Sequence, residues 1–492
     1  MGRSLLFLVS GLTIITGIIQ VNNAKRVTAI PEVSVDYYNA QQARNLSKSL
    51  IDNAVETMKA NNNWTGSINM SDVVDTLALL SRSNIGRKQL ALGDINVDQL
   101  DEIEEDIEDL IEGSSSYASG IEMTGSLASY TSASQNTPSN NSVGTWDEYK
   151  VLLVSSSTYD DIQVTTEVLM QRDSYSKYSY MTQSELSSTG GTIWFMDADN
   201  IYGPIHTNGQ FAMSGNPSFY GLVTSPNMWR AHSTNPTNPN FYGGENFNAP
   251  VKDSPNTYEV DRLVDAANDG GKRYSGDIDA NFYYDVNGGY VDITYGGSSG
   301  NGCAYWMWWC TPIPPTPPTV ETVDLTAING VISTDGEITV QGDVNGSVTL
   351  HAEDEIQIMG DIEYKTSPLT DSTSTDLLGL VSEGDVIIDR YAHTVNGTQD
   401  LTVHASIVAL NTSFSVENYS SGGARGTLNM LGGIIQKNRG PVGTFSGSSI
   451  VSGYSKNYQY DGRLKASIPP SFPRESIFSI VYWKDEITKI SD

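Results

Sequence analysis

A short apolar pattern recurs from residue 328 to residue 435 and restricts what this chain can fold into. Two apolar residues flank a single intervening residue, and many such pairs follow one another every six to ten residues, separated by Gly, Asn or Asp. The pairs are Ile338/Val340, Val348/Leu350, Ile356/Ile358, Ile362/Tyr364, Val386/Ile388, Leu401/Val403, Phe414/Val416 and Leu428/Met430. Each face of a parallel β-helix requires a short strand with two inward apolar side chains and then a turn. We therefore expect a mainly β fold, a parallel, right-handed β-helix or solenoid; an antiparallel sandwich is the alternative.

The N-terminus carries an apolar run at residues 5–19, with Arg3 before it and Lys25 and Arg26 after it. As a helix these residues rise about 22 Å, less than the roughly 30 Å of a membrane's hydrocarbon core, so a span needs tilt or thinning. A cleaved signal peptide is the alternative. Either interpretation predicts a protein of the cell envelope whose bulk is exported from the cytoplasm, anchored by the N-terminal helix if it is retained.

Two helices are expected after this run. Residues 36–60 place one face of small and apolar residues at three- and four-residue spacing. That face comprises Ala40, Ala43, Ser47, Leu50, Ala54 and Met58. Residues 100–111 combine an apolar face with a strongly acidic one, which indicates a solvated surface. A structural calcium ion is the one cofactor considered, but the spaced loop of an EF-hand is missing.

Composition shifts along the chain predict its domains. Gly, Ser, Thr and Asn dominate after the second helix, and β-branched alternation begins near Trp146. The predicted divisions are a membrane anchor or signal segment (1–26), a helical stalk (27–112), a Ser/Thr/Asn-rich linker (113–145), a β-solenoid domain (146–472) with an insertion (225–318), and a C-terminal tail (473–492).

The charge balance excludes one class of partner. The 28 basic residues against 58 acidic residues leave a formal net charge of −30 at pH 7. Phosphate-rich molecules would be repelled, so we expect no nucleic-acid binding.

Two cysteines, Cys303 and Cys310, enclose an aromatic loop. A metal site would need further ligands nearby, so we predict a local disulfide in an oxidising compartment; free thiols are the alternative. The loop residues Tyr305, Trp306, Trp308 and Trp309 are candidate contacts for a sugar, a peptide or a partner subunit, or they fold onto the chain itself.

The segment from Gly203 to Gly221 reads GPIHTNGQFAMSGNPSFYG, a run of turn residues and very short apolar stretches. It resembles the signature block of a family of bacterial exported surface proteins similar to pilus-assembly (minor pilin-type) proteins, whose function is largely uncharacterised. The resemblance covers residues 174–225 and 328–472, and residues 37–43 resemble the start of the pilin-type helix. Its signature residues are Gly203, Pro204, His206, Thr207, Asn208, Gly209, Gly215, Pro217 and Phe219.

No catalytic motif accompanies the chemically reactive residues. His206 lacks a neighbouring G-x-S-x-G, H-E-x-x-H or phosphate-binding motif, and we expect its imidazole to bond the backbone at a corner. The acids of the periodic region stand where Asp is favoured in turns. They are Asp343, Asp354, Glu355, Asp361, Asp385 and Asp389.

These observations predict a non-catalytic cell-surface or pilus-associated structural or adhesion protein. Its expected partners are the membrane, through the N-terminal segment, other surface or pilus-type proteins, and glycans. The alternative is a polysaccharide-active enzyme or a carbohydrate-binding module on a β-helix scaffold, which would need clustered acids beside a cleft.

Overall fold

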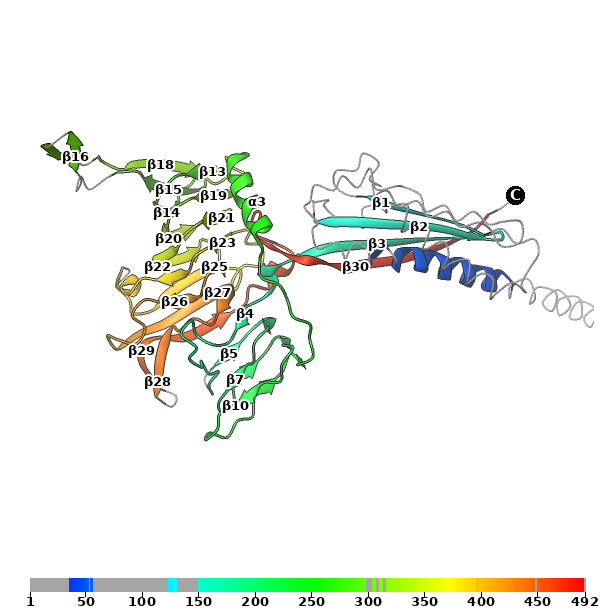
Figure 1. Cartoon of the computed structure of the whole chain (residues 1–492), viewed down its shortest axis with the longest axis horizontal. Coiled ribbons are helices and arrows are strands. Elements are labelled where there is room, and N and C mark those ends of the chain that lie inside the picture. The colour runs from blue at the N-terminus through cyan, green and yellow to red at the C-terminus, as the bar shows by residue number, and fades with distance from the viewer. Residues whose placement is uncertain are drawn as a thin grey trace, which may run out of the picture. The chain divides into compact units, whose positions relative to one another are not determined.

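The structure, a computed structural model, describes residues 35–52, 54–55, 123–130, 149–197, 199–297, 303–306, 309–312, 316–395, 397–446 and 449–490 (Figure 1). The backbone alone is described at 123–130, 303–306 and 309–312. The chain divides into two compact units. Unit 1 ends at Arg172 and resumes at Ser476, and unit 2 comprises Asp173–Glu475. Unit 2 is thus inserted into unit 1 in sequence.

Unit 1 packs a helix against an antiparallel sheet. Residues 35–52 and 54–55 are helical, and the strands β1 (Met123–Tyr130), β2 (Lys150–Tyr159) and β3 (Ile162–Ser174) pair antiparallel in that order. Strand β30 (Arg474–Lys489) lies beside β3. The strands β2 and β3, expected within a solenoid domain starting at 146, belong to this unit, and the predicted tail 473–492 supplies its last strand.

The expected small-residue face of the helix is the buried one. Ala43 and Ser47 are fully buried, and Leu50 and Ala54 join a core that includes Val151, Val168, Met170 and Phe478. The hydroxyl of Ser47 lies 2.8 Å from those of both Ser155 and Thr166, so small side chains let helix and sheet approach closely. Ala40 is only partly buried.

Several sequence predictions lie outside the described residues. These are the apolar run at 5–19, the acidic helix at 100–111, the linker at 113–122 and 131–145, and Met58. Among the helices that the structure describes, none combines the length and apolar character that a membrane span requires.

Unit 2 is built on long ladders of parallel strands (Figure 1). The first ladder is β13 (Lys272–Tyr274), β19 (Val331–Thr334), β21 (Ser347–Ala352), β23 (Leu377–Ser382), β25 (Leu401–Ala409), β27 (Ala424–Asn438), β4 (Tyr180–Ser184), β6 (Ile205–Thr207), β9 (Val223–Thr224) and β12 (Glu245–Asn246). The second is β14 (Ile278–Tyr284), β20 (Ile338–Val344), β22 (Ile356–Tyr364), β24 (Val386–Ile388) and β26 (Phe414–Val416). A third continues from β27 to β29 (Ser449–Gln459), β5 (Asn200–Ile201), β8 (Ser218–Phe219) and β11 (Asn240–Phe241).

The predicted apolar pairs stack on one another along these ladders. Ile338, Ile356, Val386 and Phe414 occupy one register position in four successive strands, and each is at most 1% exposed. All the predicted pairs lie in one continuous core. Burying a Val or Ile side chain contributes roughly 1.5–3 kcal/mol, so this column of residues favours the parallel register. The pairings exclude the antiparallel sandwich for this region.

The segment 225–318, predicted as an insertion, is partly built into the ladders. It supplies β10 (Arg230–Ala231), which pairs with β7 (Ala212–Met213), as well as β11, β12, β13 and β14. It also contains α3 (Thr257–Asn268), whose buried Leu263 and Ala267 pack on the outer side of the first ladder. The segment's Asn, Pro and Gly mark turns between short strands.

The remaining strands pair antiparallel. β15 (Gly289–Tyr295) lies between β14 and β18 (Thr319–Asp324), and β28 (Gly443–Ser446) pairs with β29. Among the residues that the structure describes, three short 3-10 helices occur, at Tyr175–Lys177, Ala392–Thr394 and Gly462–Lys465.

The aromatic loop forms the hairpin of β16 (Cys303–Trp306) and β17 (Trp309–Pro312). Its register sets Cys303 opposite Pro312, Cys310 opposite Tyr305, and Trp306 opposite Trp309. The two cysteines are therefore not opposite each other in the hairpin, and the predicted disulfide is not supported. Trp308 lies outside the described residues.

Candidate functional site

The signature block lies toward one end of the first ladder, to which it contributes β6. Within β6, His206 lies between Met181 of β4 and Thr224 of β9, so its strand is covered on both edges. His206 and Thr207 are fully buried. Two-residue and three-residue strands leave little room for regular structure, so the block is held by turns and side-chain hydrogen bonds.

The glycines of the block allow neighbouring backbone and side chains to lie close to it. Gly203 and Gly215 have φ of +83° and +75°, a region that other residues rarely adopt. A side chain at Gly215 would also collide with the carboxylate of Asp197. The carbonyl groups of Pro204 and Pro217 accept hydrogen bonds from the backbone N–H groups of Ser179 and Asn240, and Phe219 enters the core. Gly209 lies against the backbone of Glu185.

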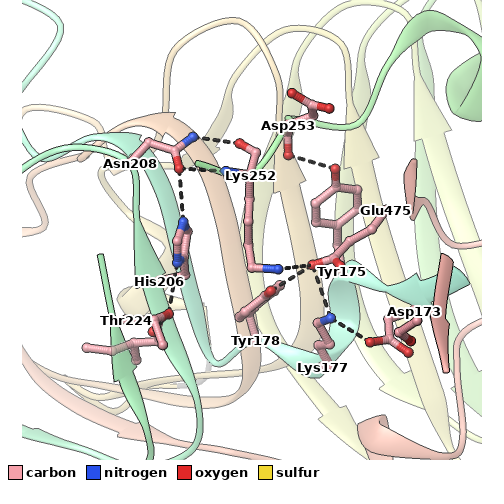
Figure 2. Close-up of polar contacts among 12 residues, drawn as sticks. Asp173, Tyr175, Lys177, Tyr178, His206, Asn208, Thr224, Lys252, Asp253 and Glu475 are labelled. Atoms are coloured by element: carbon pink, nitrogen blue, oxygen red, sulfur yellow. Dashed lines mark hydrogen bonds and ion pairs between the residues drawn. The ribbon is translucent and has the colours of Figure 1, made fainter. Parts of the chain in front are cut away.

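Both ring nitrogens of His206 have partners (Figure 2). Nε2 is 2.9 Å from Asn208 Oδ1, which can only accept, so Nε2 carries the proton. Nδ1 is 2.8 Å from the hydroxyl of Thr224. Burial lowers the pKa of His206, and the charge of Lys252 lowers it further, although the bond to Asn208 opposes this. The ring is therefore neutral near pH 7, with Nδ1 as an acceptor.

Asn208 uses its whole amide. Oδ1 also accepts the backbone N–H of Lys252 at 2.9 Å, and Nδ2 donates to the backbone oxygen of Lys252 at 2.6 Å and to the side-chain oxygen of Gln183. This pairing fixes the orientation of the amide and attaches the segment at 252 to the signature block. An Asn is required because its Oδ1 accepts two hydrogen bonds while its Nδ2 donates two, which needs a side-chain amide at this position.

A charged cluster continues from Lys252 (Figure 2). Oε1 of Glu475 accepts from the hydroxyl of Tyr178 at 2.7 Å and lies 3.1 Å from the ammonium groups of both Lys177 and Lys252. Lys177 is also 2.8 Å from Asp173. Burial alone would raise the pKa of Glu475, but the two ammonium groups outweigh it and lower that pKa. Burial and the Glu475 carboxylate raise the pKa of the Tyr178 hydroxyl, which stays protonated.

We call these residues the signature clamp: Asp173, Lys177, Tyr178, His206, Asn208, Thr224, Lys252 and Glu475. It joins the first and last residues of unit 2 to the signature block. His206 and Asn208 belong to the signature that the sequence identifies, but the prediction that the imidazole bonds the backbone at a corner is wrong. The ring lies within β6 and bonds the side chains of Thr224 and Asn208. The other members come from distant segments and carry no motif, so sequence reasoning missed them.

A second buried polar cluster was also missed. Arg439 Nη1 lies 3.1 Å from Oε2 of Glu185, with the two side chains 5% and 2% exposed. The other carboxylate oxygen of Glu185 accepts from the hydroxyls of Thr182, at 2.5 Å, and Tyr180, at 3.2 Å. Burial by itself lowers the pKa of Arg439, but the Tyr180 hydroxyl and the Glu185 carboxylate outweigh it and raise that pKa, so the guanidinium stays charged.

Of the six acids predicted to lie in turns, Asp354, Glu355, Asp385 and Asp389 lie between strands, whereas Asp343 and Asp361 lie within β20 and β22; three of the six accept a backbone N–H group. Asp361, Asp385 and Asp389 each accept one, from Thr402, Ser413 and Tyr391. Glu355 differs: burial, and then the nearby Glu337 and Asp385, raise its pKa to about 7. Within the described ranges, the acids, histidines and cysteines form no group of three that could hold a metal ion.

Comparisons with known proteins give limited information. Residues 150–227 match a family described as a domain of unknown function, DUF4900. The match includes β2, β3 and the whole signature block. No curated protein matches the chain. Among solved structures, the chain is similar to the competence-associated pilin ComZ from Thermus thermophilus, with 10% identity, a TM-score of 0.30, and coverage of 93% of this chain and 98% of that one.

Proposed function

We propose that this chain is a non-catalytic structural protein of the cell surface, associated with pilus-type proteins. The observation that carries the proposal is the signature clamp. Its histidine offers neither nitrogen to a substrate, because Thr224 and Asn208 occupy both. Its carboxylate neutralises two lysines and accepts from a tyrosine, so the groups that could do acid–base chemistry instead hold the fold together.

The proposal includes the architecture of unit 2 as a β-solenoid. Three parallel ladders, of which the first and the third share β27, with apolar residues stacked in register, support this interpretation. Strands at about 4.8 Å spacing pair on both edges except at the ends of such a stack, which suits a rigid projecting body. A rigid body of this kind is useful to a surface protein because it needs no partner to keep its shape.

Unit 1 supports the pilus-type association. Its helix follows the predicted anchor segment 1–26 and packs through a small-residue face on an antiparallel sheet. A helix that leads out of the membrane onto a sheet is the arrangement that the resemblance to pilin-type proteins implies. In this proposal unit 1 mediates assembly with pilus-type proteins, the N-terminal segment anchors it, and unit 2 is the domain displayed outside the cell. The hairpin of β16 and β17, with its aromatic residues, is proposed as a contact for a partner.

The proposal is tested by localisation together with a clamp variant. Immunogold labelling of intact cells should place the protein on the envelope surface or on fibres. His206→Gln should lower the thermal stability of unit 2 without creating or abolishing any polysaccharide-degrading activity of the purified protein. Release of reducing or unsaturated ends from a polysaccharide panel by the wild type, lost in His206→Gln at unchanged stability, would instead establish the enzymatic alternative.

A further inference from the structure

Unit 2 contains a cleft of about 440 Å³ whose lining residues belong to no sequence motif described above. Thr192, Trp194, Asp199, Tyr419, Phe445 and Lys456 are among the residues that line it. Its volume is within the roughly 300–1,000 Å³ of small-molecule sites. The cleft does not contain any residue of the signature clamp.

Two walls of the cleft are aromatic, and one is held in place. The ring of Trp194 packs edge-on against His232 at 4.7 Å and lies 5.3 Å from the guanidinium of Arg230. Arg230 in turn donates to the hydroxyl of Thr192 at 2.6 Å. These contacts fix the indole before any ligand arrives, which lowers the entropy cost of binding. Phe445 is 39% exposed, so its ring is accessible to a stacking partner, and the ammonium group of Lys456 lies 5.9 Å from the centre of that ring.

The cleft also presents a hydrogen-bond donor beside an acceptor. Lys456 Nζ lies 3.5 Å from Oδ1 of Asp199, and the two side chains are 16% and 10% exposed. The other oxygen of Asp199 accepts the backbone N–H of Met196 at 2.8 Å, so the carboxylate is fixed. A long ion pair leaves ammonium protons and carboxylate lone pairs to spare. The pair carries no net charge, which disfavours strongly charged ligands.

We propose that this cleft binds a neutral pyranose residue of an oligosaccharide. The apolar face of the sugar ring stacks on Trp194 and Phe445. One hydroxyl of a vicinal diol donates to Asp199, and its neighbour accepts from Lys456. A vicinal diol matches a fixed donor and a fixed acceptor side by side between aromatic walls. The site gives a surface protein a glycan ligand, and the structural role proposed above does not depend on it.

Binding of the purified full chain to cellotetraose, maltotetraose, chitotetraose and mannotetraose, measured by isothermal titration calorimetry, tests the proposal. We expect at least one of them to bind with a dissociation constant of order 1 mM or tighter. Trp194→Ala and Lys456→Met should each weaken that binding by about tenfold or more. Phe445→Ala, at an exposed position that tolerates substitution, should weaken it without affecting folding. Tyr242→Ala is the matched control, because it removes a 66% exposed aromatic ring that does not line the cleft.

Two results would overturn the inference. One is the absence of binding by all four oligosaccharides up to about 10 mM, a concentration well above the expected dissociation constant. The other is binding that Phe445→Ala and Lys456→Met leave unchanged while Tyr242→Ala reduces it, which would place the glycan elsewhere. Neither result would alter the localisation of the protein, so the structural proposal is tested separately.

Discussion

Replacing Arg439 by Met should be among the most destabilising single changes in unit 2. The substitution keeps much of the side-chain volume but leaves the carboxylate of Glu185 buried without its counter-charge. Two neutral hydroxyls remain as donors, from Thr182 and Tyr180, and they cannot replace a guanidinium. Breaking a buried pair by removing one partner costs about 3–5 kcal/mol. Met also loses the stacking of the guanidinium on Phe195, whose ring centre is 3.7 Å away.

The expected value is about 4 kcal/mol, read from the unfolding transition of unit 2 in urea. Glu185→Gln should cost less, because the amide still accepts from the two hydroxyls. In Arg439→Met/Glu185→Gln neither charge is buried alone. The double variant should therefore lose at least about 2 kcal/mol less free energy of unfolding than the sum of the two single losses. Lys437→Met, which removes an exposed charge two residues away, should change stability by no more than about 0.5 kcal/mol.

Additive single and double changes, or an Arg439→Met cost below about 1 kcal/mol, would refute the reasoning. Either result would mean that Glu185 becomes protonated or hydrated at little cost, and that the pair is not a determinant of the fold.

Three further predictions follow from single contacts. The pKa of Glu355 is raised to about 7 in the folded chain, so the stability of unit 2 falls as the pH rises from about 4.5 to 7. Glu355→Gln should abolish that fall and stabilise unit 2 at pH 8 by roughly 1–2 kcal/mol, measured by thermal melts across pH. A pH profile that the substitution leaves unchanged would contradict this. Asn208→Asp should cost roughly 2–4 kcal/mol, because a carboxylate would face the oxygens of Gln183 and Lys252; a urea midpoint equal to that of Asn208→Ala would argue against it. Gly221→Ala should prevent unit 2 from folding normally, because the added Cβ would lie 1.8 Å from the backbone oxygen of Gly203. Gly276 faces open space but has a φ of +78°, so Gly276→Ala should cost only about 1–2 kcal/mol of stability. Circular dichroism and protease resistance distinguish the two variants.

Local patterns were sufficient to predict much of the strand content and one helix face. A pair of apolar residues around a single intervening residue buries both on one side of a strand, whatever lies next to it. Ile338, Ile356 and Val386 are therefore fully buried as expected, and so are Ala43 and Ser47 on the helix. The turn chemistry of Gly and Asp likewise predicted corners at Gly203 and Asp385, because it depends on the conformation of the residue itself.

The order of stacking was decided by tertiary structure. β27 pairs with both β25 and β4, so strands more than two hundred residues apart in sequence become neighbours, and residues 225–318 become part of the ladders. The signature clamp follows from this, since Glu475 reaches Tyr178 across 297 residues and Lys252 reaches Asn208 across 44. Hydrogen bonds and ion pairs act only over a few ångströms, so their partners exist only once the rungs have stacked. The partners of His206, the buried pair of Arg439 and Glu185, and the aromatic cleft therefore had no signature in the local sequence.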